Sequence, residues 1–407
     1  MRIRTWCVAA ALACFPRLAA AQTVLSEAEA LARLSAESPR VRAIRSAIDV
    51  ARAEALAQGR WPNPRVTFNR EAVAGITENM FFVTQPLPIT GRRGLDVDAL
   101  SALVVATERR ADEEIRQVRA AVRSAFADLV SAQAREAEIS ASRDRLRGLA
   151  DILARREAAG EAAGYDRLRA EREVMDLDAD TVVARTDRVR AQAALAGFFA
   201  APADAGSLVA VAPKPSGRAM LPSVEELVAH GESSLPELAA LKQEIESAEF
   251  AARAAGRRPV PEPEVVAGTK SSTLGGGDLG SVLSVHFTVP LFDRAKPEHS
   301  LADARRRQAE ARIAAFQTAL RAKVAALRAV VIERQQAADG YRVAIAASAS
   351  QLERIAEISY DAGERGILEL LDAYRNGGAA RIRQAVLDAA ARQAEIELEL
   401  ASGWEIR

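Results

Sequence analysis

Apolar residues recur at heptad spacing along several long stretches of this chain. The first stretch runs from about Arg93 to Ala158 without a proline, and its apolar positions are Ile115, Val118, Val122, Phe126, Leu129, Ile139, Leu146 and Leu153. Such a sustained repeat predicts α-helices that pack as coiled coils. A helix of about 65 residues is roughly 100 Å long, which is far more than a globular core requires.

A second helix is predicted to return along the first as its antiparallel partner. Its repeat consists of Leu168, Met175, Val182 and Val189, which are each seven apart. We expect these four side chains to line one buried seam. The later part of the chain repeats both helices, with apolar positions at Leu320, Val324, Leu327, Val331, Ile345, Leu352, Ile382 and Val386.

Segments with a two-residue period predict β-strands between the helices. The clearest alternates Leu279, Ser281, Leu283, Val285, Phe287 and Val289 with Val282, Ser284, His286 and Thr288. Weaker strand patterns cover Glu264–Ser271, Val66–Ala72 and Met80–Thr84. Four strands of about ten residues suit the wall of a membrane β-barrel, and equally two soluble hairpins. Four strands cannot close a barrel, so the membrane interpretation requires an oligomer, and three chains would supply twelve strands.

Capping patterns and prolines mark a helix at the start of each half. Ser26 is followed by Glu29, and Ser223 by Glu226, so both pairs fit a capping box. Each helix should end at prolines, because proline lacks the amide hydrogen and clashes with the preceding turn. The prolines concerned are Pro62, Pro64, Pro259, Pro261 and Pro263.

The same order of segments occurs twice. Trp61-Pro62-Asn63-Pro64 recurs as Arg258-Pro259-Val260-Pro261, and Gly160-Glu161-Ala162-Ala163-Gly164 recurs as Gly363-Glu364-Arg365-Gly366-Ile367. The glycine-rich stretch Ser272–Gly280 has no counterpart of equal length, so we interpret it as an insertion. A period near 200 residues is too long for a solenoid unit. We therefore expect residues 22–215 and 216–407 to be two structural repeats of one domain.

The N-terminal residues 1–21 read as a signal peptide. A basic start precedes the apolar run from Trp6 to Phe15, and small residues precede Gln22. Both cysteines, Cys7 and Cys14, lie in this segment, so the mature chain would have neither a disulfide nor a thiolate metal site. Lipidation of Cys14 is an alternative to simple cleavage. The prediction is an exported protein.

Charge and composition exclude several function classes. Removal of residues 1–21 removes three arginines, so the mature charge is 52 − 55 = −3, which gives no reason to propose nucleic acid as a partner. The three histidines are scattered, and no nucleophile–base group, metal-ligand spacing or phosphate loop is present. We expect neither an enzyme nor a bound cofactor or metal. No run of about 18 apolar residues follows residue 21.

The doubled order of helix, proline-marked entry, two strands, Pro-Leu exit, long helix, glycine turn and returning helix covers residues 24–403. It resembles the TolC-type outer membrane efflux proteins. The resemblance implies a mainly α fold with a small β part, in which a homotrimer forms a twelve-stranded outer-membrane barrel continued by an α-helical periplasmic tunnel. It also implies partners: a periplasmic adaptor protein, an inner-membrane pump and outer-membrane lipid.

The resemblance further implies functional positions at the two glycine turns. Gly160, Gly164, Gly363 and Gly366 match the family's hairpin tips, where an adaptor docks. Asp166, Tyr360 and Arg365 match the positions that hold the tunnel entrance closed, and we expect Arg365 to pair with Asp166 directly or through Tyr360. Glu369 and Asp372 match the acidic rings at the narrowest point, which favour cations.

Within the family, Gly91-Arg92-Arg93-Gly94 and Leu368-Glu369-Leu370-Leu371-Asp372-Ala373 most resemble the heavy-metal and divalent-cation efflux branch. The expected function is therefore a passive exit duct in which divalent cations are favoured. A duct for drugs or other organic solutes, or for type I secretion, is the first alternative. A periplasmic coiled-coil scaffold without a channel is the second.

Overall fold

The computed structural model describes residues 23–36, 38–160, 164–199, 205–212, 220–275 and 277–406. The predicted signal peptide lies outside the described residues, as do the turn residues 161–163. The chain divides into two compact units. The helical unit comprises residues 1–33, 125–215 and 344–389, and the sheet unit comprises residues 34–124, 216–343 and 390–407.

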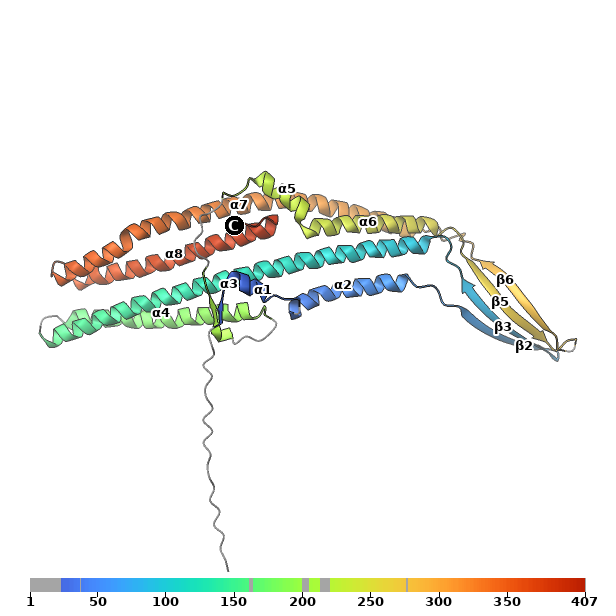
Figure 1. Cartoon of the computed structure of the whole chain (residues 1–407), viewed down its shortest axis with the longest axis horizontal. Coiled ribbons are helices and arrows are strands. Elements are labelled where there is room, and N and C mark those ends of the chain that lie inside the picture. Colours follow the sequence, from blue (N-terminus) through green and yellow to red (C-terminus); the bar gives the residue numbers. More distant parts are fainter. Residues whose placement is uncertain are drawn as a thin grey trace, which may run out of the picture. The chain divides into compact units, whose positions relative to one another are not determined.

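Four long helices supply most of the helical unit. Their full bounds are α3 Arg92–Ala158, α4 Gly164–Ala196, α7 Lys296–Asp361 and α8 Ile367–Ser402. Within this unit α3 and α4 form one antiparallel hairpin, and α7 and α8 form another (Figure 1). The unit also contains α1 (Glu27–Ala32), a 3₁₀ turn (Ala205–Ser207) and a parallel ribbon of β1 (Thr23–Leu25) and β4 (Leu208–Ala210).

The core of the helical unit lies between its hairpins and confirms the heptad prediction for α3. Leu146 and Leu153, two predicted heptad positions, are buried against the first turns of α8. The full set of buried core residues is Leu146, Leu149, Ala150, Leu153, Ala170, Ala356, Ile367, Leu370 and Leu371. Burying a leucine side chain contributes about 1.5–3 kcal/mol to stability, so this cluster stabilises the packing of the two hairpins near their turns.

The predicted seam of α4 is exposed, so the expectation that it is buried is wrong for a single copy of the chain. The exposed fractions of Leu168, Met175, Val182 and Val189 are 58%, 64%, 66% and 50%. We call these four residues the outer seam. The buried residues of α4 lie on a different face and are Ala170, Thr181, Ala184, Gln192 and Leu195. Within the described part of the chain, α4 packs through this second face and leaves the outer seam exposed.

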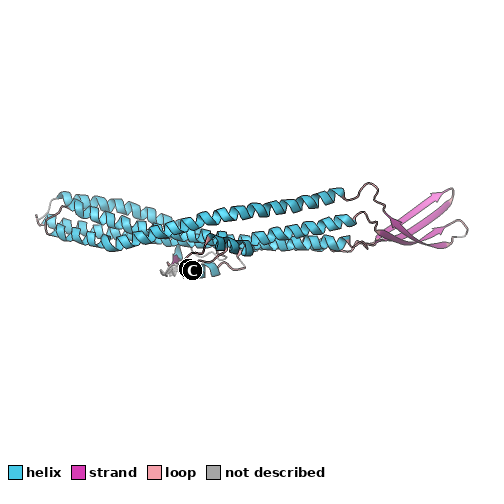
Figure 2. Ribbon diagram, turned by 90° about the horizontal axis from the view of Figure 1, so that it is seen from above, coloured by secondary structure: helices cyan, strands magenta, loops and turns pink. Residues whose placement is uncertain are grey.

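The sheet unit contains a four-stranded antiparallel sheet in the order β2-β3-β5-β6. The strands are β2 Arg65–Val73, β3 Ile76–Pro86, β5 Pro263–Ser272 and β6 Leu279–Phe287. The four predicted strands are thereby confirmed, and they lie beyond the helix ends of the same unit (Figure 2). The two-residue turn Ala74–Gly75 has left-handed backbone angles, whereas the β5–β6 connection is longer, as the glycine-rich insertion predicts.

Helices α2 (Pro39–Gln58), α5 (Val224–Ser234) and α6 (Pro236–Arg257) complete the sheet unit together with parts of α3, α7 and α8. Both predicted capping boxes are present, at Ser26 and Ser223. Each predicted opening helix is broken into two, because Pro39 and Pro236 occupy first helical positions and start a new helix there. The core of this unit includes the predicted heptad positions Leu320, Val324 and Val331.

Candidate functional site

The sheet has one mainly apolar face, which also carries Arg70, Asn79 and Thr269, and one mainly polar face. The strand register places alternate residues of all four strands on a common side. The large exposed residues of one side are Val66, Phe68, Phe81, Val83, Leu279, Leu283, Val285 and Phe287. The opposite side carries the polar residues Arg65, Thr67, Asn69, Glu71, Glu78, Glu264, Lys270, Ser284 and His286. Neighbouring strands therefore present matching faces, which the alternation in β6 predicts and the weaker strands do not reveal alone.

The polar face is not uniformly polar. Met80, Phe82 and Val266 share it, in agreement with the prediction that Met80–Thr84 is apolar on both sides. A Cβ at Gly268 would lie 2.5 Å from the ring of Phe82, so glycine is required where that ring crosses β5. Lys270 pairs with Glu78 across β3 and β5 at 2.6 Å on this face.

Glycines lie at both turns that connect the paired helices of the helical unit. Gly160 (φ 76°) follows the end of α3, and Gly363 (φ 73°) follows the end of α7. Both have left-handed backbone angles, which glycine adopts without strain. Gly164 is the first residue of α4, and Gly366 directly precedes α8. Gly160 and Gly363 thus occupy equivalent places after their helices, whereas Gly164 and Gly366 differ by one position at the start of the next helix.

Two predicted gate residues, Tyr360 and Asp166, lie at these tips together with Arg156 and Asp361. Tyr360 lies in the last turn of α7, where burial raises the pKa of its phenol, and the nearby Asp166 carboxylate of α4 raises that pKa further. Arg156 of α3 opposes this rise. The same Arg156 pairs with Asp361 at 3.0 Å, which joins the two hairpins.

Arg365 does not pair with Asp166 in the single chain. Neither side chain makes a hydrogen bond or ion pair with the other within the described part of the helical unit, and Arg365 is exposed. Glu369 lies in the first turn of α8, and Asp372 lies one turn later, where its carboxylate accepts from Asn376 Nδ2 at 2.9 Å. Both acidic side chains are exposed. Their role in a gate stays a prediction.

Sequence reasoning missed the tip residues that pair within the chain. These include Arg156 with Asp361, Arg167 of α4 with Glu157 of α3, and Arg375 of α8 with Glu173 of α4. Asp361 directly follows Tyr360, and Arg156 lies one turn before Gly160, so sequence proximity to the tip motifs was the available signal. Charged residues are common along these helices, and their pairing depends on how each helix is rotated about its axis.

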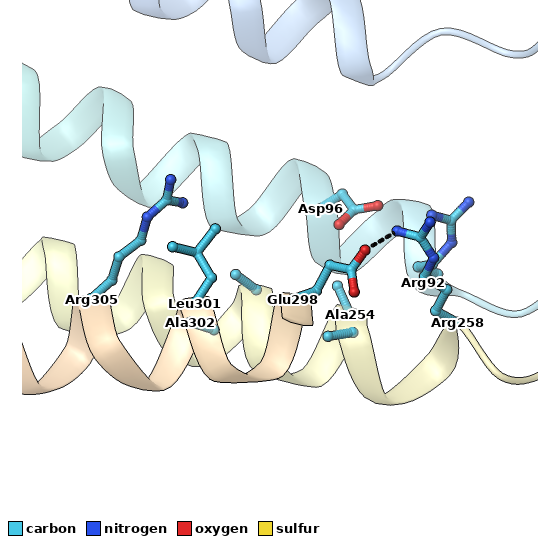
Figure 3. Close-up of a pocket in the computed structure, with 10 residues that line it drawn as sticks. Arg92, Asp96, Ala254, Arg258, Glu298, Leu301, Ala302 and Arg305 are labelled. Atoms are coloured by element: carbon cyan, nitrogen blue, oxygen red, sulfur yellow. Dashed lines mark hydrogen bonds and ion pairs between the residues drawn. The ribbon is translucent and has the colours of Figure 1, made fainter. Parts of the chain in front are cut away.

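Ion pairs and a hydrogen bond join the segments between helices and strands in the sheet unit. A pocket of about 190 Å³ lies among α3, α6 and α7, and its charged lining residues are Arg92, Asp96, Arg258, Glu298 and Arg305 (Figure 3). Arg258 binds Glu298 at 2.5 Å and Asp293 at 2.9 Å. Thr90, after β3, donates to Glu262, before β5, at 2.6 Å. These contacts hold together the segments that lead into and out of β3, β5 and β6.

Among the residues that the structure describes, no group of three or more His, Cys, Asp or Glu side chains could hold a metal ion. None of their helices is long and apolar enough to cross a membrane.

The sequence matches a known family over part of its length. Residues 232–404 match the model of the family described as "Outer membrane efflux protein". This segment contains α6, both strands of the second hairpin, and α7 with α8. No curated protein sequence matches the chain.

Solved membrane proteins share the fold. A membrane protein from Pseudomonas aeruginosa is 21% identical, with a TM-score of 0.75 and 93% of each chain covered. CusC, from a study of transmembrane channel formation, is 15% identical, with a TM-score of 0.72 and coverage of 92% of this chain and 91% of that one. The open MtrE outer membrane channel of Neisseria gonorrhoeae is 17% identical, with a TM-score of 0.70 and coverage of 93% and 89%. The chain therefore has the mainly helical fold with a small sheet that these membrane proteins have.

Proposed function

We propose that three copies of this chain form an outer-membrane exit duct of a tripartite efflux system. The duct passively conducts substrates from the periplasm to the exterior after it docks with a periplasmic adaptor protein and an inner-membrane pump. The observation that carries the proposal is the two-faced sheet in a chain whose second half matches the efflux family. An exported chain with this architecture would lie in the outer membrane of a Gram-negative bacterium.

The sheet supports a membrane location because of what each face would contact. Large apolar side chains on one face, from Val66 to Phe287, would lie in lipid, and the charged face would line water. Strands of 9 to 11 residues match the length of a tilted membrane strand. The outer strands β2 and β6 each leave one edge without a neighbour in the sheet. Three copies would pair these edges and close twelve strands into a barrel.

The outer seam of α4 supports assembly from several copies. Four apolar residues seven apart are the signature of a helix that packs against another helix. Leu168, Met175, Val182 and Val189 have no such partner within the chain. On the part of α7 in the same unit, Leu352, Ile355 and Ile358 are also exposed. Packing of α4 against α7 of a neighbouring copy is a head-to-tail contact, which closes into a ring when the rotation is right.

The hairpin tips would form the periplasmic gate of this duct, with Asp166, Tyr360 and Arg365 holding it closed. A partly exposed Arg–carboxylate pair contributes only about 1 kcal/mol, so a docked adaptor could open such a contact. Glu369 and Asp372, repeated in three copies, would make an acidic constriction. This negative charge would favour the passage of cations, and we propose divalent heavy-metal cations as the substrates. The tip glycines Gly160, Gly164, Gly363 and Gly366 would receive the adaptor.

Conductance in planar bilayers tests the gate. We expect the double variant Arg365→Ser with Tyr360→Phe to conduct more than wild type, because both substitutions remove closing contacts. The control Arg169→Ser changes an arginine of the same tip that binds only Tyr165 of its own helix, and it should conduct like wild type. If the double variant also conducts like wild type, these residues are ordinary surface groups.

Two other functions remain as alternatives. A duct for organic solutes or secreted proteins would share the whole architecture and differ only in its pump and adaptor. A periplasmic scaffold without a channel would be stable without detergent, and the apolar sheet face argues against it, because such a large exposed apolar surface is rare on soluble proteins.

A further inference from the structure

A charged layer crosses the helical unit, and none of its residues is among those of the proposed gate. Arg381 of α8 donates through Nε to Glu138 Oε2 of α3 at 2.9 Å, and its Nη2 lies 3.1 Å from Glu353 Oε1 of α7. The side chain of Glu353 is 13% exposed and that of Arg381 is 24% exposed. One arginine thus joins three helices from both hairpins.

The sequence of α8 makes room for this layer. A Cβ at Gly377 would overlap the carboxylate of Glu353, and one at Gly378 would lie 2.7 Å from Ser142 Oγ, closer than real Cβ atoms approach. Both glycines lie in the interior of α8, where glycine disfavours the helix. The chain therefore gives up helix propensity at two successive positions; Glu353 of the charged layer occupies the space at Gly377, and Ser142 of α3 occupies the space at Gly378.

Stability alone does not account for the layer. Removing three charges from water opposes folding about as strongly as their attraction favours it, and apolar replacements of similar volume are often neutral or stabilising. Burial lowers the pKa of Arg381, but bonding to Glu353 and Glu138 outweighs it and the pKa is raised overall. The best-attested use of such a layer is to fix the register of packed helices.

Register needs fixing at this point in α8. The partly buried residues on either side of Arg381 include Ala380 and Ala385. Alanine side chains are small and alike, so their contacts distinguish poorly between shifted alignments of two helices. An arginine held between two carboxylates has one alignment, because a slip of one residue moves its guanidinium by about 1.5 Å along the axis and by about 100° around it.

We propose that Arg381 is a positioning residue for the gate: by fixing α8 against α3 and α7, it sets the height of Glu369 and Asp372. These two acids lie on the same continuous helix, roughly 18 and 14 Å away along its axis. A slip at the layer would therefore move both. This inference rests on the proposed function, because the gate belongs to that proposal.

The test replaces the layer by apolar side chains of similar volume, with Arg381→Met, Glu138→Met and Glu353→Met in one variant. Spin labels at Glu369→Cys and Asp151→Cys report the alignment of α8 against α3, in a background where Cys7 and Cys14 are serine. Labelled chain is diluted with excess unlabelled chain, so that only distances within one copy are measured. Arg381→Lys is the conservative rescue. Arg375→Met, which breaks an exposed pair closer to Glu369, is the control.

We expect the triple variant to melt no lower than wild type, yet to show a shifted or broadened distance, by about 1.5 Å per residue of slip. Its block by trivalent cations should weaken as well, while Arg381→Lys and Arg375→Met keep the wild-type distance. A wild-type distance in the triple variant overturns the inference. If the triple variant does not fold, Gly377→Ala, which displaces Glu353 without removing a charge, must shift the distance, and an unchanged distance again overturns it. A wild-type protein without cation-selective pores would instead refute the proposed function, and the distance would still decide the register.

Discussion

Ser223 and Glu226 cap the start of α5 by bonding to each other's backbone. The Ser223 Oγ accepts from the Glu226 amide at 3.2 Å, and Glu226 Oε2 accepts from the Ser223 amide at 2.8 Å. We expect Ser223→Ala to lower the free energy of unfolding by about 1 kcal/mol, as measured by chemical denaturation in detergent. Ser233→Ala is the matched control, because that hydroxyl bonds only to the carbonyl of His230 in its own helix.

The same cap predicts a pH dependence. The backbone hydrogen bond from Ser223 is the main cause that lowers the pKa of Glu226 below its ordinary value of 4.5. A carboxyl group with a lowered folded pKa adds stability above its unfolded pKa, and this stability is lost as the pH falls through the folded pKa. The stability gap between wild type and Glu226→Ala, which removes the carboxylate itself, should therefore shrink in acid. A gap that stays constant from neutral pH to about pH 3 would refute this assignment.

Asp96 predicts the opposite sign. Burial raises its pKa above the ordinary value of 3.8, although Arg92 opposes the rise. The folded state then binds protons more readily than the unfolded state, so stability falls as the pH rises from 3.8 through the folded pKa. We expect Asp96→Asn to gain stability over wild type at neutral pH and to match it in strong acid. Melting temperatures of both proteins, measured from strong acid to neutral pH, test this expectation. An Asp96→Asn variant less stable than wild type at neutral pH would contradict it.

At the scale of elements, two leucines with the same heptad signature should behave differently. Leu153 of α3 is fully buried in the helical core, and Leu168 of α4 belongs to the exposed outer seam. We expect Leu153→Ala to lower the free energy of unfolding by about 2–5 kcal/mol. Leu168→Ala should leave the stability of the chain nearly unchanged and weaken its assembly, as read by native mass measurement in detergent. Equal losses of stability would show that the outer seam is buried within the chain.

This pair also shows what the sequence could predict. The heptads predicted the long helices and the buried face of α3, and the alternation in β6 predicted the sheet and its apolar side, whereas the predicted seam of α4 is exposed. Periodicity does not say whether a face is buried within the chain, so Leu168 and Leu153 could not be separated. The tip motifs placed Tyr360 near Asp166, whereas the Arg156–Asp361 pair depends on helix rotation that no local pattern records. The charged layer around Arg381, for which Gly377 makes room, could be recognised only from the three-dimensional structure.

The two faces of β6 predict opposite responses to a new charge. Leu283 lies on the apolar face and Ser284 on the polar face. We expect Leu283→Lys to destabilise the membrane-inserted form by about 2–4 kcal/mol if it lies near the bilayer midplane. Ser284→Lys, which faces the proposed lumen, should be tolerated. Insertion into lipid vesicles, followed by protease protection, distinguishes the two variants, and equal insertion of both would count against a lipid-facing apolar side.

At the level of the whole molecule, the proposed duct requires three chains. Among the described residues of one copy, the outer seam of α4 is exposed, and β2 and β6 each have one edge without a neighbouring strand. We expect the detergent-solubilised protein to have the mass of a trimer. Val182→Asp should reduce the trimer fraction and leave the helical circular dichroism signal intact, because Val182 is exposed in the single chain. A stable monomer that needs no detergent would favour the scaffold alternative.

The most direct test of the duct is the reversal potential of the purified protein in planar bilayers under a salt gradient. We expect discrete conductance steps and a reversal potential whose sign shows that cations pass more readily than anions. We also expect that Glu369→Ala with Asp372→Ala moves this potential toward zero and relieves block by trivalent cations, because the acidic constriction is removed. A wild-type protein that gives no conductance steps, with or without the gate substitutions Arg365→Ser and Tyr360→Phe, would contradict the claim that this chain forms a channel.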